Sequence, residues 1–84
     1  TIEDFAEVTE AIYPKDGPGG RVMDLDTPPS VLNGAIERGN KVLVPRGTTM
    51  VEPGDHLFLV TTPDQVDAVE EWLASQAGAQ AAKQ

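Results

Sequence analysis

The stretch Ile36–Val60 constrains the fold most, because short apolar runs alternate in it with turn signals. Gly39-Asn40 separates two strand-like runs, and a two-residue connection of this kind predicts a β-hairpin. Pro53-Gly54 marks a further turn, and the nearly unbroken apolar run His56–Val60 that follows it is typical of a central strand covered on both faces. The stretch therefore predicts a strand, a tight turn and two more strands.

The N-terminal part adds a strand, a loop and a short helix. Phe5–Tyr13 is predicted to be a strand, although the spacing of its apolar residues also fits a short helix. A loop rich in glycine and proline separates it from Arg21–Leu25, where we expect one or two helical turns. Val31–Arg38 predicts the first strand of the hairpin, with a bulge at Gly34, and Lys41–Val44 predicts the returning strand.

The C-terminal part predicts a helix from Thr62 to about Ser75. Thr62 is placed to be its N-cap, Pro63 suits the first helical position, and Gln65 completes a capping box. The apolar face of this helix consists of Val66, Val69 and Leu73, with Trp72 beside them.

The order of these elements predicts an α+β fold. We expect a small mixed or antiparallel sheet of four or five strands, with the short helix and the C-terminal helix packed on one side of it. The domain is expected to span residues 1–76, and residues 77–84 are expected to form a flexible tail.

Length and composition narrow the function classes. The chain has 84 residues, which suits one domain with a small core and favours sites that are shallow or shared between two copies. Its formal net charge of −8 repels phosphate backbones and argues against nucleic-acid binding. It contains no cysteine, which excludes disulfides and thiolate metal sites. No apolar run reaches the roughly 20 residues of a membrane helix, so we expect no direct membrane insertion by this segment.

Residues suited to catalysis or metal binding are sparse. His56 is the single histidine, and the serines are Ser30 and Ser75, so a set of nucleophile, base and orienting group is not available. His56 also has no second histidine, cysteine or spaced carboxylate motif to form a metal site with it. Asp24 and Asp26 could hold a cation or could simply be solvated at a helix end. We therefore predict that the chain is not an enzyme and has no metal site.

One string of residues carries a resemblance to a known family: Ile36-x-Arg38-Gly39-Asn40-x-Val42-Leu43-Val44-Pro45-Arg46-Gly47-x-Thr49-x-Val51-x-x-Gly54-Asp55-x-Leu57. It resembles the C-terminal domain of RCK/TrkA-type proteins, the regulatory modules attached to potassium channels and cation transporters. Gly20–Leu25 upstream and Thr61–Asp64 downstream match the same family, so the resemblance covers about Phe5 to Leu73. The sub-string Val44–Gly47 looks most like versions found on cation/proton antiporters.

The resemblance implies a homodimer with small-molecule pockets at or near the dimer interface. Some family members bind cyclic di-AMP there, and others bind ions or have no known ligand, so the implied ligand is a cyclic dinucleotide, another nucleotide or none. The implied function is a regulatory ligand-binding and dimerisation domain that gates a transport protein for potassium or another monovalent cation. That partner would be a transmembrane channel, a Trk/Ktr-type uptake system or a cation/proton antiporter, on the same or a separate chain. The implied location is the cytoplasm, at the inner face of the cell membrane. The alternative is a purely structural dimerisation or docking module without a small-molecule ligand.

Six residues near the hairpin are candidates for ligand contact: Ile36, Arg38, Asn40, Val42, Pro45 and Arg46. The guanidinium of Arg38 could clamp a phosphate bidentately, or it could pair with a carboxylate beside the hairpin. Asn40 could contact a ligand or serve only as a turn residue that tolerates positive φ. Ile36, Val42 and Pro45 could form an apolar wall for a base ring, although Ile36 and Val42 also suit the core of a sheet.

Two further residues occupy predicted turns. Arg46, beside a glycine, could contact a ligand or a partner, or it could be a surface charge. Asp55, which follows a glycine just before the central strand, is expected to accept backbone N–H bonds and shape its turn.

Overall fold

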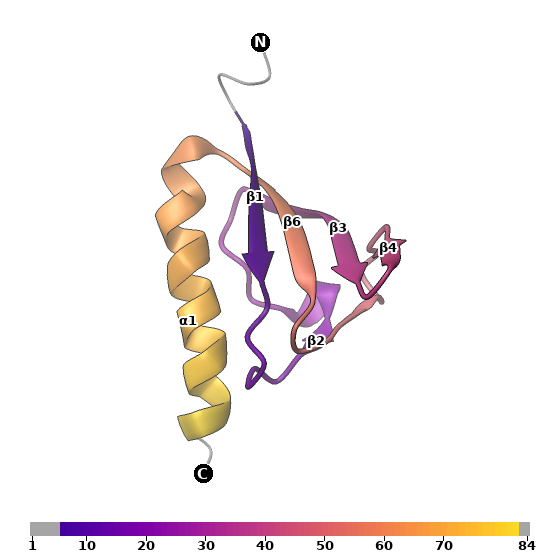
Figure 1. Cartoon of the computed structure of the whole chain (residues 1–84). Coiled ribbons are helices and arrows are strands. Elements are labelled where there is room, and N and C mark those ends of the chain that lie inside the picture. The colour runs from indigo at the N-terminus through magenta and orange to yellow at the C-terminus, as the bar shows by residue number, and fades with distance from the viewer. Residues whose placement is uncertain (1–5, 83–84) are drawn as a thin grey trace.

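The computed structural model describes residues 6–82 and shows a main sheet, a smaller sheet and a long helix (Figure 1). The main sheet is antiparallel, with strands in the order β1-β6-β3-β4, and the smaller sheet pairs β2 with β5. The predicted α+β class is therefore confirmed. The elements, with η denoting a 3-10 turn, are β1 Glu7–Ile12, β2 Gly20–Arg21, η2 Val22–Asp24, β3 Val31–Arg38, β4 Lys41–Leu43, β5 Met50–Val51, β6 His56–Thr61, η3 Pro63–Gln65 and α1 Val66–Ala82.

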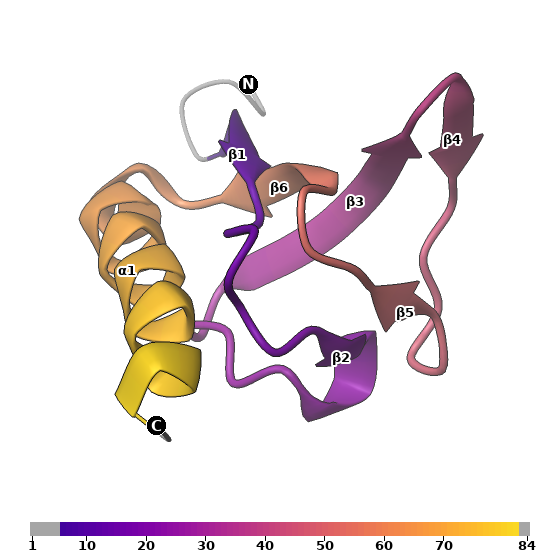
Figure 2. The ribbon, with the colours of Figure 1, turned by 60° about the horizontal axis from the view of Figure 1, so that its bottom comes forward.

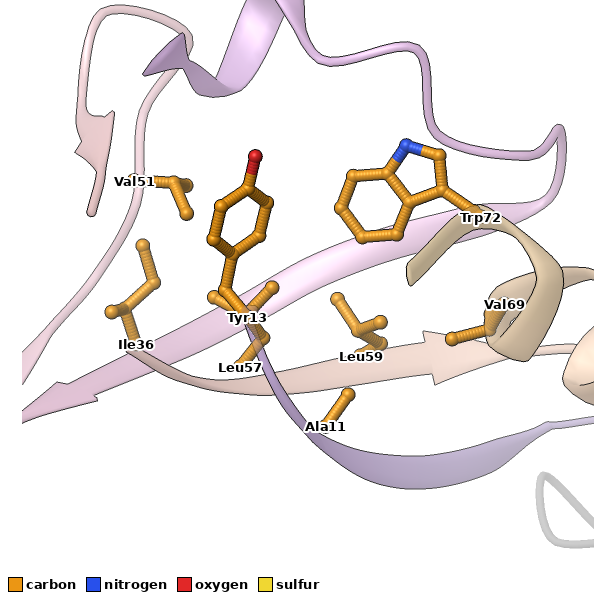
Figure 3. Packing of buried hydrophobic residues seen from close by; sticks show 8 residues of the cluster. All are labelled: Ala11, Tyr13, Ile36, Val51, Leu57, Leu59, Val69 and Trp72. Carbon is orange, nitrogen blue, oxygen red and sulfur yellow. The ribbon is translucent and has the colours of Figure 1, made fainter. Parts of the chain in front are cut away.

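The core lies on one side of the main sheet, where α1 and the β2–β5 pair cover it (Figures 2 and 3). Tyr13 is fully buried there, and its ring centre lies 6.1 Å from that of Trp72, with the two planes inclined at 58°. Both helical segments thus pack on one side of the sheet, as predicted. The buried apolar residues of the core are Ala11, Tyr13, Ile36, Val51, Leu57, Leu59, Val69 and Trp72.

The N-terminal strand is confirmed over the alternative helix. β1 begins at Glu7, and Phe5, at the start of the predicted strand, lies outside the described residues. The predicted helical segment Arg21–Leu25 is shorter than expected, because Arg21 belongs to β2 and a single 3-10 turn follows it. The small β2–β5 sheet is an addition that the sequence did not predict.

β3 carries the predicted bulge. Its register with β6 pairs Asn33 with Leu59 and Ala35 with Phe58, so Gly34 is the extra residue. A side chain at Gly34 would begin 3.4 Å from the backbone oxygen of Phe58. The absence of that side chain leaves a stretch of backbone uncovered on the face of the sheet that points away from the core.

The predicted hairpin is also confirmed: Gly39 and Asn40 connect β3 to β4, with Arg38 opposite Lys41. The residue with positive φ is Gly39, at 61°, and not Asn40. Glycine takes this position because it has no Cβ to oppose the left-handed conformation. β4 ends at Leu43, one residue earlier than predicted.

β6 is the central strand, as predicted, but it is not covered on both faces within residues 6–82. Three alternate side chains are buried against the core: Leu57, Leu59 and Thr61. The other face carries the partly exposed side chains of His56, Phe58 and Val60. Since α1 and the β2–β5 pair both lie on the core side, no described element covers this outer face (Figure 2). The expectation was wrong because an apolar run does not distinguish a face covered by its own chain from one left open.

α1 runs from Val66 to Ala82, past the predicted end near Ser75, and so includes residues 77–82 of the predicted tail. Thr62 is the N-cap and Pro63 lies in the first turn, as predicted. The predicted capping box is wrong, because the Thr62 side chain makes no capping bond and the Gln65 N–H donates instead to the backbone oxygen of Thr62 at 2.9 Å. The boundary of the domain at residue 76 stays a prediction. The predicted apolar face is confirmed for Val69, Trp72 and Leu73, which contact the core, whereas Val66 is only partly buried and lies outside the core cluster.

Candidate ligand-binding site around Arg38

Arg38, at the end of β3, holds the turn that precedes β6. Its Nε donates to Asp55 Oδ1 at 2.8 Å and its Nη2 donates to Asp55 Oδ2 at 2.7 Å, which makes a bidentate pair. Nη2 also donates to the backbone oxygen of Met50 at 2.9 Å, and Nη1 lies 3.1 Å from Glu52 Oε2. The guanidinium therefore joins the end of β3 to β5 and to the turn after it. This geometry supports the reading of Arg38 as a partner of carboxylates.

Asp55 is the buried anion of this group, with 2% of its side chain exposed. Its Oδ2 also accepts the backbone N–H of Glu52 at 2.8 Å, which confirms the predicted role of Asp55 in shaping the turn. Burial raises the pKa of the Asp55 carboxyl, but the hydrogen bonds from Arg38 and Glu52 and the charge of Arg38 outweigh it, so the pKa lies below its ordinary value. Asp55 is therefore ionised and paired at neutral pH.

The nitrogens of the Arg38 guanidinium differ in how firmly they are held. Nε and Nη2 contact the buried carboxylate of Asp55, whereas Nη1 meets Glu52, whose side chain is 56% exposed. An exposed ion pair contributes about 0–1 kcal/mol. A phosphate oxygen could therefore replace Glu52 at Nη1 while the bidentate pair with Asp55 stays intact. Chemically, the site can accept an anionic ligand by displacing one weak contact.

The structure does not bring the six candidate residues together on one surface. Ile36 is fully buried, so its assignment to the core is confirmed. Val42 is 67% exposed on the outer face, so its alternative assignment to the core is wrong. The two residues differ because the strand pairing sets Glu37, rather than Ile36, opposite Val42. A ligand that touched Arg38 on the core side of the sheet would not reach Val42 in the same copy.

The remaining candidates lie at the hairpin tip and in the connection between β4 and β5. Asn40 and Arg46 are exposed, and Pro45 is half-buried. The backbone N–H of Arg46 donates to Thr49 Oγ1 at 2.9 Å, and the Thr49 N–H donates to the backbone oxygen of Arg46 at 3.0 Å. The ligand roles of these three candidates stay predictions.

The outer face holds a polar group that the sequence did not reveal. Nδ1 of His56 lies 3.1 Å from Glu10 Oε1 and 4.0 Å from Glu37 Oε1. Glu10 and His56 are 46 residues apart and meet only because β1 and β6 are neighbours. Elsewhere, Asp24 pairs with Arg21 across 2.6 Å between Oδ2 and Nε, and both side chains are exposed.

The described residues form no enclosed pocket, metal site or membrane-spanning helix. A single copy encloses no pocket between residues 6 and 82. No group of three or more histidine, aspartate or glutamate side chains in that range is arranged to hold a metal ion. No helix in the described part combines the length and the apolar character needed to cross a membrane.

Comparison with known proteins places this arrangement in a family. The model of the TrkA-C domain matches residues 18–74, a range that contains both Arg38 and Asp55. The chain is also 40% identical over 53 residues to the Trk system potassium uptake protein TrkA homolog of Archaeoglobus fulgidus. That alignment covers 63% of this chain and 12% of the relative, so the chain spans a small part of that protein's length. Because the family model matches more than half of its residues, this chain belongs to the TrkA-C domain family.

Proposed function

We propose that this chain is a regulatory domain of a potassium transport system. The observation that carries the proposal is the TrkA-C match over residues 18–74, and the name of the relative, a potassium uptake protein, supports it. The transport step belongs to a transmembrane partner on the same or a separate chain, which is a channel, a Trk/Ktr-type uptake system or a cation/proton antiporter. The domain acts at the cytoplasmic face of the membrane that holds this partner.

In this proposal the domain works as a homodimer and regulates transport when a small ligand changes how the two copies pair. A ligand shifts an equilibrium between two arrangements only when it binds one of them better than the other. The coupling between ligand and transporter therefore requires contacts that differ between the two paired states. The site around Arg38 is a candidate for such contacts, because its Glu52 partner is exposed and replaceable.

The ligand in this proposal is a nucleotide with an accessible phosphate, such as cyclic di-AMP. Nη1 of Arg38 takes a phosphate oxygen in place of Glu52, while Asp55 keeps the guanidinium in its present orientation. Arg46, an exposed cation in the connection between β4 and β5, is the further residue proposed to contact the phosphate. A bidentate clamp of Arg38 on phosphate is not part of the proposal, because Nε and Nη2 are already engaged.

The second candidate function is a structural dimerisation or docking module that binds no small molecule. The observation that favours it is the full engagement of the Arg38 guanidinium by Asp55, Glu52 and Met50. On this reading Arg38 holds the fold together, and the domain serves transport only by joining its parent protein to a partner.

A nucleotide that binds the site is expected to raise the melting temperature of the chain. At a ligand concentration of about 100 times Kd, binding stabilises the native state by about 2.7 kcal/mol, which corresponds to a rise of roughly 10 °C or more for a domain of this size. The measurement is a thermal-shift series with cyclic di-AMP, cyclic di-GMP, ATP and AMP, followed by calorimetry on any nucleotide that gives a shift.

Two matched variants make this experiment specific. Glu52→Gln frees Nη1 of Arg38 and is expected to strengthen binding of a phosphate ligand several-fold, because it removes the anion that competes for the same nitrogen. Glu70→Gln makes the same change of charge on the exposed surface of α1 and is expected to leave binding unchanged. If no nucleotide shifts the melting temperature of either the wild type or the Glu52→Gln variant, the structural module is the better account.

A further inference from the structure

Large apolar side chains gather on the outer face of the main sheet. Seven large hydrophobic residues of the described chain are well exposed, and four of them lie on this face with 55% to 71% exposure. Phe58 and Val60 on β6 stand among them and are half-buried. Scattered exposed hydrophobic residues are normal on a protein surface, but a contiguous patch marks an interaction site. The four exposed residues of this patch are Val8, Ile12, Leu32 and Val42.

The strand register places an aliphatic row near one end of this face, one residue pair in from the ends of the three strands. Val8 on β1 is opposite Val60 on β6, and Val60 is opposite Leu32 on β3. Beside this row the bulge at Gly34 presents no side chain, so that another surface can approach the backbone closely. The His56 group with its two glutamates lies beyond Phe58, toward the other end of the strands. The face is therefore most continuously apolar at the Val8–Val60–Leu32 end and carries its polar group at the other end.

The outer face carries two carboxylates, Glu10 and Glu37, which both lie beside His56, and much of the remaining negative charge lies elsewhere. The net charge is −8, so pairing through an acidic surface would be opposed by repulsion. The exposed carboxylates of Asp67, Glu70 and Glu71 are on α1, which covers the opposite face of the sheet (Figure 2). Sheets that stack face to face lie about 10 Å apart, and each helix adds a layer of about 10 Å. The two acidic helices would thus lie roughly 30 Å apart, several times the Debye length of about 8 Å at physiological salt.

We propose that a second copy of this chain packs on the outer face, sheet against sheet, with the row Val8–Val60–Leu32 within the contact. The inference rests on the proposed function, which calls for a homodimer but does not say which surface pairs. A two-fold axis brings the same patch of both copies together, and a patch that is aliphatic throughout is complementary to itself. Two sheets packed in this way form the layered arrangement of a β-sandwich, with the apolar side chains of both inner faces interdigitated.

The size of the face predicts a reversible dimer. At about 4.8 Å between strands and about 3.4 Å per residue, the face is roughly 15–20 Å in each direction. Its flat footprint of roughly 225–400 Å² is at most about half of the ~800 Å² that each partner contributes to a standard interface. We therefore expect a dimer with a dissociation constant in the micromolar range, which suits pairing that a ligand is able to shift.

The test is sedimentation equilibrium of the wild type and two matched variants between about 10 μM and 1 mM in 0.15 M salt. The wild type is expected to move from the 8.9 kDa of one chain toward twice that mass. Leu32→Glu places a charge within the contact and is expected to raise the dissociation constant at least ~30-fold. Met23→Glu introduces the same charge at an exposed apolar residue of η2, on the core side of the sheet, and is expected to leave the constant within about twofold. Circular dichroism checks that both variants fold.

A second measurement needs no variant. In a dilution series followed by NMR, the amide shifts that depend on concentration are expected to concentrate on β1, β3 and β6, and the amides of α1 are expected to stay unchanged. A wild type that remains at 8.9 kDa up to 1 mM would overturn the second copy as the occupant of this face. A dimer that survives Leu32→Glu, or dilution shifts confined to α1, would overturn the choice of surface while leaving the homodimer of the proposed function in place. A dimer that behaves as expected, but binds no nucleotide, would leave this inference standing and refute only the ligand.

Discussion

Replacing Arg38 with methionine is expected to lower the free energy of unfolding by about 3 kcal/mol. The variant leaves the carboxylate of Asp55, 2% exposed, without its cation, and removal of one partner from a buried ion pair typically costs about 3–5 kcal/mol. The lower end of that range applies because the Arg38 side chain is itself 34% exposed, so water can reach part of the site. The Arg38→Met variant also loses the hydrogen bond from Nη2 to the backbone oxygen of Met50.

Urea unfolding at neutral pH measures this effect, and Arg46→Met is its control. Arg46 is an exposed arginine, and its replacement changes the net charge equally without removing an ion pair with a buried partner, so we expect less than about 0.5 kcal/mol. A double-mutant cycle with Asp55→Asn isolates the pair itself, with an expected coupling of about 1–3 kcal/mol. Equal losses in Arg38→Met and Arg46→Met would show that the bidentate pair contributes nothing to stability.

The same pair makes stability depend on pH in a defined direction. Burial raises the pKa of Asp55, but its bonds with Arg38 and Glu52 lower it further, so the folded-state pKa lies below that of the unfolded chain. The stabilisation is therefore fully present above the unfolded-state pKa of about 3.9 and is lost as the pH falls through the lower folded-state value. Asp55→Asn is expected to flatten this decline in urea midpoints measured from pH 6 down to about pH 2. If the decline is unchanged in this variant, the loss of stability at low pH comes from other carboxylates.

This structural role decides how a ligand at the site should be tested. An Arg38 variant that loses nucleotide binding would be uninformative, because the variant also loosens the turn that carries Glu52 and Asp55. Glu52→Gln avoids the problem, since the bidentate pair between Arg38 and Asp55 is untouched and only an exposed partner of Nη1 is neutralised. Nε and Nη2 of Arg38 thus serve stability, whereas Nη1 is the nitrogen at which ligand binding is tested.

The features that local chemistry decides were predicted from the sequence. The hairpin follows from Gly39-Asn40, because a two-residue turn between strands needs a residue that accepts positive φ. The bulge follows from Gly34, because a glycine inside a strand marks a place where the pairing shifts. The turn role of Asp55 follows from a carboxylate placed to accept nearby backbone N–H groups. Each of these signals lies within a few residues of the structure that it predicts.

The features that were missed depend on which strands become neighbours. Arg38 meets Asp55 because β3 pairs with β6 and Glu37 lies opposite His56, so the residue after Glu37 comes beside the residue before His56. Sequence spacing alone does not reveal this contact until the pairing of the strands is known. The small β2–β5 sheet was missed for the same reason, since two-residue strands have no periodic pattern of their own. The open outer face was missed because its residues are as apolar as those of a core.

Replacing Tyr13 with alanine is expected to lower the free energy of unfolding by about 4 kcal/mol, the largest effect of any single change proposed for this chain. Tyr13 is fully buried, and truncation of a buried aromatic side chain typically costs about 3–5 kcal/mol through lost transfer energy and the cavity left behind. The neighbouring ring of Trp72 also loses its aromatic contact. The total stability of an 84-residue domain is about 4–13 kcal/mol, so the variant is expected to be at the margin of folding.

The hydroxyl group of Tyr13 has a separate and smaller role. It accepts the backbone N–H of Gly19 at 3.0 Å and donates to Gln76 Oε1 at 2.7 Å, so it ties the loop before β2 to α1. Burial raises the pKa of this phenol while the bond from Gly19 opposes the rise, and the group stays protonated as a donor to Gln76. Tyr13→Phe keeps the ring but leaves the Gly19 N–H without this acceptor, which is expected to cost about 1–2 kcal/mol.

Thermal and urea unfolding of Tyr13→Ala, Tyr13→Phe and the control Met23→Ala separate these contributions. Met23 is 59% exposed, so its truncation is expected to change stability by less than about 0.5 kcal/mol. A loss in Tyr13→Phe as large as in Tyr13→Ala would mean that the hydroxyl bonds, and not ring packing, hold α1 to the sheet. The backbone N–H of Tyr13 also donates to the backbone oxygen of Asp55 at 2.8 Å, and its backbone oxygen accepts the Gly54 N–H at 2.9 Å. Tyr13 thus aligns the same turn that presents Asp55 to Arg38, so the core and the candidate site are expected to weaken together when its ring is removed.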